Sequence, residues 1–368
     1  MLKKIISAVL CLTMIGCLAA CGSKGDDLSD DGGYTQTTSS GETVEEKKVI
    51  NPLTGLSDIS ADKVGDRPVA VMINNIKVAW SVQKGLSDAD IVYETYAEGG
   101  VTRLMAVFKD VSKVKDIGTV RSARYTYVDL ASGHDAIYVH CGLDPNYCKP
   151  HMKAINMDDF DINTGKTASY GFRVKNGKAR EHTMYTSGAK LTQGIEKLGY
   201  RTEAKNSNWA SFNPENEPAV LSGGACDKLT VPMSDKTYVS TFTYDAATGK
   251  YKKTQGGSAH NDTGAGEQIA VTNVLVLFTN VSTYADKYHM NIDLNGGSGY
   301  YISNGSYVRI NWKKGSTASS PLTFTNTDGT ELKLNAGNSW IFFTKKAVES
   351  EMRIESATPA VSSAEQTN

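Results

Sequence analysis

Two β-prone segments separated by two glycines constrain the fold of this chain more than any other feature. Residues 91–98 (IVYETYAE) and 101–108 (VTRLMAVF) are rich in β-branched and aromatic side chains. Gly99-Gly100 between them is a two-residue turn signal, so the pattern predicts a β-hairpin. The predicted cross-strand pairs are Glu98 with Val101, Tyr96 with Arg103, and Glu94 with Met105.

This register would place several polar side chains on one face of the hairpin. Side chains of a strand alternate between its two faces, so the polar residues of both segments gather on one side. A helix over residues 87–97 is the alternative, and it would scatter the acidic residues. The side chains that the hairpin brings together are Glu94, Tyr96, Glu98 and Arg103.

The rest of the first half mixes strand and helix patterns. Residues 69–73 and 136–141 are short apolar runs that predict buried strands. Residues 123–131 repeat apolar groups at helical spacing, so we expect Arg121 and Arg124 to project from the first turn of that helix. Residues 187–198, followed by Gly199, predict an amphipathic helix with a clear end.

The pattern changes from about residue 229 onward. Alternating segments and turn signals such as Asn304-Gly305 and Asp328-Gly329 predict a smaller, mostly antiparallel β domain after the mixed α/β domain. The predicted fold class is therefore α+β. The predicted divisions are a signal peptide (1–20), a lipidated cysteine with a flexible tether (21–48), the mixed α/β domain (49–212), a linker (213–224), the β domain (225–347) and a disordered tail (348–368).

The N-terminus resembles a lipoprotein export signal. Lys3 and Lys4 precede an apolar run, residues 5–20, which ends in small residues directly before Cys21. Cleavage there would leave Cys21 to carry diacylglycerol and palmitate, which hold a protein stably on a membrane. We therefore expect a lipid anchor on the extracytoplasmic face of the cell membrane. An ordinary signal peptide with a chance cysteine is the alternative.

Composition excludes some partners and leaves the cysteines open. Lys and Arg total 39 against 40 Asp and Glu, so the chain lacks the basic excess of a nucleic-acid-binding protein. No zinc-protease or serine-hydrolase motif occurs, and we expect neither a cofactor nor a metal. Three cysteines, Cys141, Cys148 and Cys226, remain in the predicted domains. Their spacing allows a Cys141–Cys148 disulfide but does not require one.

A set of polar residues in the first domain is the candidate site. Two arginine side chains near a helix N-terminus favour an anion. An ion-pair network that only orients the domain is the structural alternative, and catalysis is a further one. The candidate residues are Glu94, Glu98, Arg103, Arg121, Arg124, Asp129, Arg180 and His182.

Several motifs together resemble the YerB-type lipoproteins of Gram-positive bacteria, a two-part family of unknown function. The similarity covers about residues 51–345 and implies an envelope lipoprotein, but no reaction. Thr119 stands where the family usually has proline. Glu181-His182-Thr183 replaces a more usual Pro-His-Asn run, which argues against a catalytic His182. The motifs are RPVAVMINN (67–75), GLSDADIVYE (85–94), EGGVTR (98–103), GTVRSAR (118–124), HND (260–262), NVLV (273–276), NWKK (311–314) and GNSWI (337–341).

Three functions remain as hypotheses. The first is a membrane-anchored protein that binds an anionic envelope component, such as peptidoglycan stem peptides or wall-polymer phosphate, through an Arg/Glu cleft. The second is a peptidoglycan-active hydrolase with Glu94 or Glu98 as its acid or base. The third is a scaffold for envelope proteins. The expected partners are the membrane and a cell-wall polymer or an envelope protein.

Overall fold

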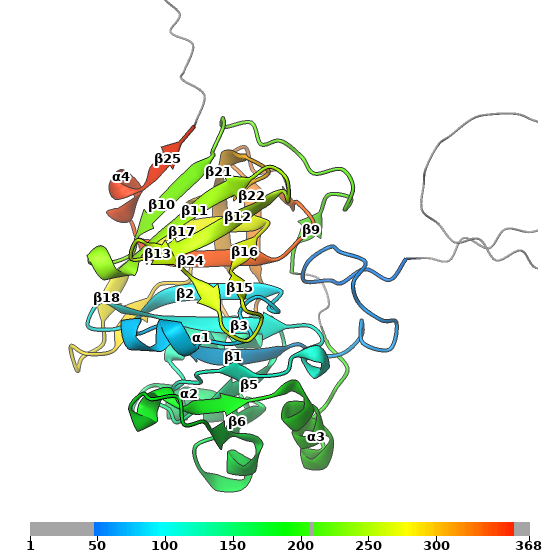
Figure 1. Ribbon diagram of the computed structural model, residues 1–368, viewed down its shortest axis with the longest axis vertical. Coiled ribbons are helices and arrows are strands. Elements are labelled where there is room, and N and C mark those ends of the chain that lie inside the picture. The colour runs from blue at the N-terminus through cyan, green and yellow to red at the C-terminus, as the bar shows by residue number, and fades with distance from the viewer. Residues whose placement is uncertain (1–47, 206–208, 357–368) are drawn as a thin grey trace, which may run out of the picture. The chain divides into compact units, whose positions relative to one another are not determined.

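The computed structural model describes residues 48–205 and 209–356. These residues form one compact unit built on a ten-stranded sheet, which takes strands from both halves of the sequence (Figure 1). The strands in order across the sheet are β22 (Leu322–Asn326), β21 (Ser306–Lys314), β20 (Gly297–Ser303), β17 (Asn273–Thr279), β24 (Ser339–Lys345), β2 (Ile91–Glu98), β3 (Val101–Phe108), β1 (Val69–Asn74), β5 (Ile137–His140) and β6 (Asp159–Asp161).

The two halves of the chain share this sheet through β24. That strand lies between β2 and β17 and runs parallel to both. Parallel neighbours need long crossover connections, which the intervening chain provides. All but the last residue of β24 are buried, in keeping with a central strand that is covered on both faces. The predicted hairpin and the predicted strands near residues 69 and 137 are present as β2–β3, β1 and β5.

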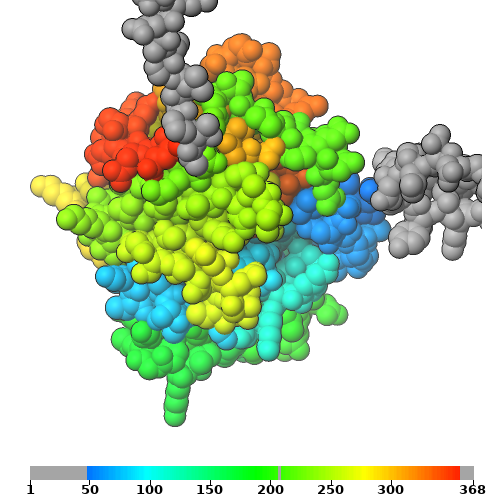
Figure 2. Space-filling view, turned by 45° about the horizontal axis from the view of Figure 1, so that its top comes forward, coloured from blue at the N-terminus to red at the C-terminus, as the bar shows by residue number. Residues whose placement is uncertain are grey.

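A second sheet covers one face of the first. Phe242 of this sheet packs against Trp340 and Phe342 of β24, with ring centroids 6.3 and 5.9 Å away. Figure 2 shows this sheet, in yellow-green, lying directly against the blue and cyan segments of the N-terminal half. Its strands are β13 (Ser258–Ala259), β12 (Lys250–Gln255), β11 (Val239–Asp245), β10 (Lys228–Pro232) and β25 (Arg353–Glu355), and β16 (Ala270–Val271) pairs with β12.

Part of the predicted disordered tail is ordered. Residues 348–355 form α4 (Val348–Glu351) and β25, which pairs with β10. Val348 is buried and Ile354 packs against the core opposite Leu229, so these apolar side chains hold the segment in place. The expectation that residues 348–355 are disordered is therefore wrong. Residues 357–368 lie outside the described part.

Helices cover the other face of the ten-stranded sheet. Tyr93 and Glu94 of β2 point to opposite faces: the Tyr93 hydroxyl lies 2.7 Å from Nε2 of His134, which ends α1 (Tyr125–Gly133), whereas Glu94 faces Trp340 under the second sheet. α3 (Gly188–Leu198) follows the prediction, because the Ser187 side chain caps its start and Gly199, with φ +65°, ends it. The remaining α-helix is α2 (Cys148–Ala154).

Shorter elements complete the fold, which is α+β as the sequence predicts. No helix among residues 48–205 and 209–356 is long and apolar enough to cross a membrane. The short strands are β4 (Ile117–Gly118), β7 (Phe172–Arg173), β8 (Met184–Thr186), β9 (Ser211–Phe212), β14 (Asn261–Asp262), β15 (Glu267–Gln268), β18 (Val281–Thr283), β19 (Met290–Ile292) and β23 (Lys333–Leu334). The 3-10 helices are Lys77–Val82, Val111–Lys113, Gly165–Tyr170, Arg180–His182 and Lys236–Tyr238.

Candidate functional site

A β-bulge near the turn of the β2–β3 hairpin divides the predicted polar set. The register shifts between Tyr96 and Glu98, so only the pair nearest the turn agrees with the prediction. The extra residue reverses the face of every residue before it in β2. Glu94 and Glu98 therefore lie on opposite faces, and the expectation that they share one is wrong. The observed pairs are Glu98 with Val101, Tyr96 with Thr102, and Glu94 with Leu104.

On the helix-covered face, Glu98 binds two arginine side chains. Its Oε1 accepts hydrogen bonds from Nη2 of Arg103 at 2.8 Å and Nη2 of Arg124 at 3.0 Å, and its Oε2 accepts from Nε of Arg124 at 3.0 Å. The Arg103 side chain is only 3% exposed and also donates to the carbonyl of Ser122. These three residues therefore form ion pairs of the kind expected if the polar set only orients the domain.

The pKa values of this group reflect burial and charge together. Burial opposes the negative charge of Glu98, but Arg103 and Arg124 outweigh it, so the pKa of Glu98 is lowered. Burial, together with the like charge of Arg124, lowers the pKa of Arg103 to about 10. Glu98 and Arg103 are therefore both ionised at neutral pH, as an ion pair requires.

Arg121 lies before α1, not in its first turn. The Arg121 N–H donates to the carbonyl of Met72 in β1, and the Arg121 carbonyl accepts from the N–H of Cys141 just after β5. These bonds hold the segment extended across the carboxyl ends of β1 and β5, so the helix begins only at Tyr125, with Arg124 as its N-cap. The expectation that both arginines project from the first turn is therefore wrong, since Arg121 lies in the extended segment and Arg124 is the N-cap residue.

The Arg121 guanidinium is weakly satisfied. Nη1 donates to Oε2 of Glu181 at 3.3 Å, and that carboxylate is 55% exposed. Nε is buried and has no hydrogen-bond partner among the described residues. A buried donor without a partner costs free energy. A ligand that accepts a hydrogen bond from this guanidinium would therefore meet a group whose bonding is incomplete. Arg121 thus differs from Arg103 and Arg124, which Glu98 already engages.

His182 lies beside Arg121 and contacts Glu181. Its Nδ1 lies 2.8 Å from Nδ2 of Asn74, an amide donor, and its Nε2 lies 3.3 Å from Oε1 of Glu181. Nδ1 therefore accepts from Asn74, and Nε2 carries the proton that faces Glu181. Burial lowers the pKa of His182. Glu181 belongs to this group, although the sequence analysis did not single it out as a candidate.

Two further candidates take no part in the Glu98 cluster. Asp129 accepts from Nε2 of His151 in α2 at 2.6 Å. The Arg180 side chain is exposed and makes no hydrogen bond among the described residues, whereas its carbonyl accepts from Arg173 at 2.6 Å. Arg173 in turn donates to the Asn163 side chain after β6, so Arg173 and Arg180 add two cations near the carboxyl ends of β5 and β6.

On the other face, Glu94 is part of a buried polar network between the two sheets. Its Oε1 accepts from Asn75 and Thr102, and its Oε2 accepts from Nε1 of Trp340 at 3.1 Å. Burial raises the pKa of Glu94. Because the side chain is fully buried, Glu94 has no path to a substrate, which removes one carboxylate of the hydrolase hypothesis.

Lys253 of β12 provides the cation of this network. Its Nζ donates to Gln255 at 2.6 Å and to Nδ1 of His260 at 3.1 Å, and it lies 4.7 Å from the ring centroid of Trp340. Burial lowers its pKa to about 8. Nε2 of His260 bonds Gln83 at 2.6 Å, so the network links the two halves of the chain. The sequence analysis missed Lys253, whose place in an alternating strand resembles that of a solvent-facing lysine.

All three described cysteines are free. Cys148 and Cys226 are buried, and Cys141 is partly buried between β5 and the segment of Arg121. No Cys141–Cys148 disulfide is present. Burial raises the pKa of the Cys141 thiol. This environment stabilises the neutral thiol rather than a nucleophilic thiolate.

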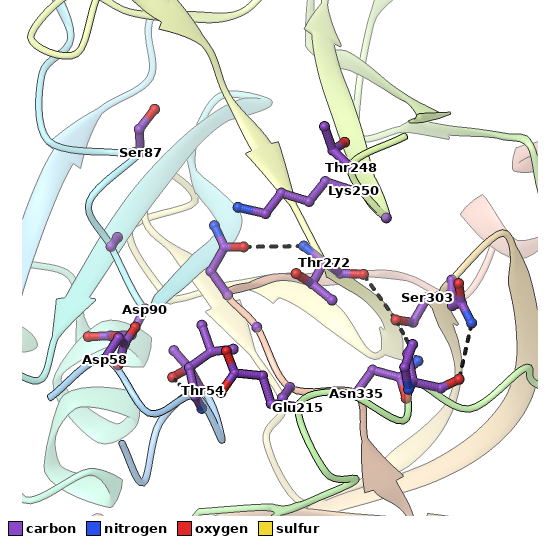
Figure 3. A pocket seen from close by; sticks show the side chains of 18 of the residues that line it. Thr54, Asp58, Ser87, Asp90, Glu215, Thr248, Lys250, Thr272, Ser303 and Asn335 are labelled. Atoms are coloured by element: carbon purple, nitrogen blue, oxygen red, sulfur yellow. Dashed lines mark hydrogen bonds between the residues drawn. The ribbon is translucent and has the colours of Figure 1, made fainter. Parts of the chain in front are cut away.

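A polar cavity of about 460 Å³ lies where several loops meet. Figure 3 shows the carboxyl groups of Asp58 and Asp90 close together, with Lys250 extending from the β12 side. Asn335 is already satisfied, since its Nδ2 donates to Ser303 at 3.0 Å and its Oδ1 accepts from the N–H of Ala219 at 2.8 Å. The lining comes from many separate segments, so no local motif predicts the cavity.

Two family models match the chain on either side of the predicted linker. The N-terminal domain of the family described as "Protein of unknown function (DUF3048)" matches residues 53–201. The C-terminal domain of the same family matches residues 229–341. Both regions contribute strands to the ten-stranded sheet.

A sequence relative and a solved structure agree with these matches. A protein of Bacillus subtilis (strain 168) named "Putative lipoprotein YerB" is 30% identical over 302 residues, which cover 80% of this chain and 86% of that protein. The crystal structure of the YerB protein from Bacillus subtilis matches with a TM-score of 0.72 at 27% identity, over 84% of this chain and 100% of that chain. The chain therefore belongs to the DUF3048 family of proteins of unknown function, in agreement with its resemblance to the YerB-type lipoproteins.

Proposed function

We propose that this protein is a lipoprotein on the extracytoplasmic face of the cell membrane, and that it binds an anionic component of the cell envelope through Arg121. The anchor would be Cys21, which lies outside the described residues. The small residues before Cys21 support this, as does the name of the Bacillus subtilis relative. The tether, residues 22–48, would give the folded part a span on the order of 30 Å from the membrane.

The incomplete bonding of Arg121 is the observation that carries the binding proposal. Guanidinium groups bind phosphates and carboxylates through several N–H groups. The Arg121 side chain is 24% exposed, and its one hydrogen bond among the described residues, from Nη1 to Glu181, is 3.3 Å long. The group lies outside the carboxyl ends of the parallel strands β1, β5 and β6, where ligands of α/β sheets commonly bind.

The surroundings of Arg121 favour a negative ligand. Arg173 and Arg180 add positive charge, whereas Glu181 is an exposed carboxylate that a stronger anion can displace. No side chain caps the start of α1, so its first N–H groups keep their partial positive charge. The ion pairs of Glu98 with Arg103 and Arg124 form the support beneath this site.

The geometry does not favour the hydrolase. Glu94 is fully buried, and both oxygens of Glu98 accept hydrogen bonds from arginine. Neither carboxylate is placed to give or take a proton from a glycan bond, and the two lie on opposite faces of the sheet. If the protein were instead a scaffold without a ligand, replacing Arg121 would not change its binding to cell walls.

Sedimentation with purified cell walls tests the proposal. Full-length protein and its Arg121→Gln variant are mixed with walls at low salt, and the bound fraction is measured. Arg353→Gln on β25 is the matched control, because it removes the same charge from an exposed arginine of the second sheet. We expect Arg121→Gln to bind at least fivefold less and Arg353→Gln to bind normally. Equal binding by both variants and the unmodified protein would refute the arginine site.

A further inference from the structure

A group of tyrosines lies next to the arginine site and has no part in the proposal so far. Tyr125 begins α1, Tyr147 precedes α2, and Tyr284 and Tyr288 lie in the loop between β18 and β19, which projects from the side of the molecule (Figure 1). We call these four residues the tyrosine surface. Three separate segments meet there, so the cluster is a product of the fold rather than of a local repeat.

Three rings of the tyrosine surface, those of Tyr125, Tyr147 and Tyr284, are packed against neighbouring rings. Tyr147 stacks on Tyr284 with centroids 4.4 Å apart, and Tyr125 stacks on His151 with centroids 4.0 Å apart. Tyr125 and Tyr284 are 6.0 Å apart, which joins the two stacked pairs. A ligand would therefore meet rings that have already lost their rotational freedom.

The polar ends of these tyrosines remain available. The hydroxyls of Tyr125, Tyr147, Tyr284 and Tyr288 have no hydrogen-bond partner among the described residues, and none of them is among the buried polar atoms that lack a partner. Tyr288 is 54% exposed. Each ring thus combines an apolar face with a free hydroxyl at its tip, which suits a ligand that has both kinds of surface.

The tyrosine surface adjoins the Glu98 cluster, which supports the arginine site. Tyr125 directly follows Arg124, and the backbone of Glu98 forms a β-bridge with His289, next to Tyr288. The nearby carboxylates are already engaged: Asp129 bonds His151, Asp286 bonds His289 at 2.6 Å, and Asp144 accepts from three backbone N–H groups at the start of α2. They therefore oppose an anion on this side less than free carboxylates would.

Resting on the proposed function, we infer that the anion bound at Arg121 belongs to a glycan chain whose sugar rings lie on the tyrosine surface. The face of an aromatic ring is electron-rich and attracts the C–H groups of a pyranose. The tyrosine hydroxyls can exchange hydrogen bonds with sugar hydroxyls. A bare phosphate polymer has no apolar face and would gain nothing from these rings.

Two polyanions separate this inference from the proposed function. Inorganic polyphosphate carries charge alone, and polygalacturonate carries charge on sugar rings. Affinities for both are measured by calorimetry with the full-length protein in detergent micelles, for the unmodified protein and for Tyr284→Leu. Leucine keeps apolar bulk and removes the aromatic face and the hydroxyl. Tyr307→Leu on β21 is the control, because Tyr307 is also a partly buried tyrosine whose hydroxyl has no described partner.

We expect Tyr284→Leu to weaken polygalacturonate binding at least tenfold and polyphosphate binding less than twofold, with Tyr307→Leu unchanged for both. Equal weakening for both polymers, or no weakening for polygalacturonate, would overturn the inference. Tyr288→Leu, at an exposed position, repeats the test if Tyr284→Leu fails to fold. If Arg121→Gln leaves polyphosphate binding unchanged, the proposed function fails whatever the tyrosine variants do.

Discussion

Replacing Glu98 with glutamine would measure how strongly the buried ion pairs support the arginine site. The variant keeps the shape of the side chain, but it leaves Arg103, 3% exposed, and Arg124, 15% exposed, without their shared carboxylate. Removing one partner of a buried ion pair costs about 3–5 kcal/mol. Because Arg103 keeps its hydrogen bond to Ser122 and Glu98 itself is 13% exposed, we expect the low end of this range, about 3 kcal/mol.

Urea unfolding of the purified protein gives this quantity directly. The midpoint should fall while the dependence of the free energy on urea stays unchanged, since the surface exposed on unfolding is the same. The double variant Glu98→Gln with Arg103→Met removes the stranded charge as well and should recover more than about 1 kcal/mol. A loss below about 1 kcal/mol for Glu98→Gln, the value of a surface ion pair, would show that this cluster is solvated and refute the reasoning.

Three further outcomes follow from the same structure. Arg103 and Arg124 outweigh burial and lower the pKa of Glu98, so its stabilising contribution is present above the ordinary glutamate pKa of about 4.3 and is lost as the pH falls through the lower folded pKa. Urea midpoints below about pH 4.3 should therefore fall more steeply for the unmodified protein than for Glu98→Gln, and parallel curves would contradict this. Lys253→Met leaves Glu94 buried without a nearby cation and should lower the free energy of unfolding by about 3 kcal/mol in urea titrations, whereas an unchanged midpoint would show that the network is dispensable. Cys21→Ala should abolish palmitate labelling and release the protein from the membrane fraction. Continued labelling of the variant would show that Cys21 does not carry the lipid.

Local patterns in the sequence were enough to predict several elements. The apolar run of β1, the glycine pair of the β2–β3 hairpin and the Ser187 and Gly199 signals of α3 each depend on neighbouring residues only. These predictions are confirmed. The α+β class follows from the same signals, because it needs only the order of strand and helix patterns along the chain.

The arrangement of the site depended on long-range contacts that no local pattern contains. The helical spacing predicts that Arg121 projects from the first turn of a helix, but its backbone pairs with Met72, 49 positions earlier in the sequence (121 − 72). The bulge before Glu98 adds one residue to β2 and so reverses the predicted faces of the β2 residues that precede it. The insertion of β24 beside β2, which buries Glu94 against Trp340, joins residues 246 positions apart.

A crystal structure of the protein soaked with pyrophosphate would test the proposed binding site most directly. We predict an anion within hydrogen-bond distance of the Arg121 guanidinium, with Glu181 displaced and the bonds of Glu98 to Arg103 and Arg124 intact. An Arg121 that keeps its contact with Glu181 at saturating pyrophosphate, with no anion beside it, would contradict the proposal.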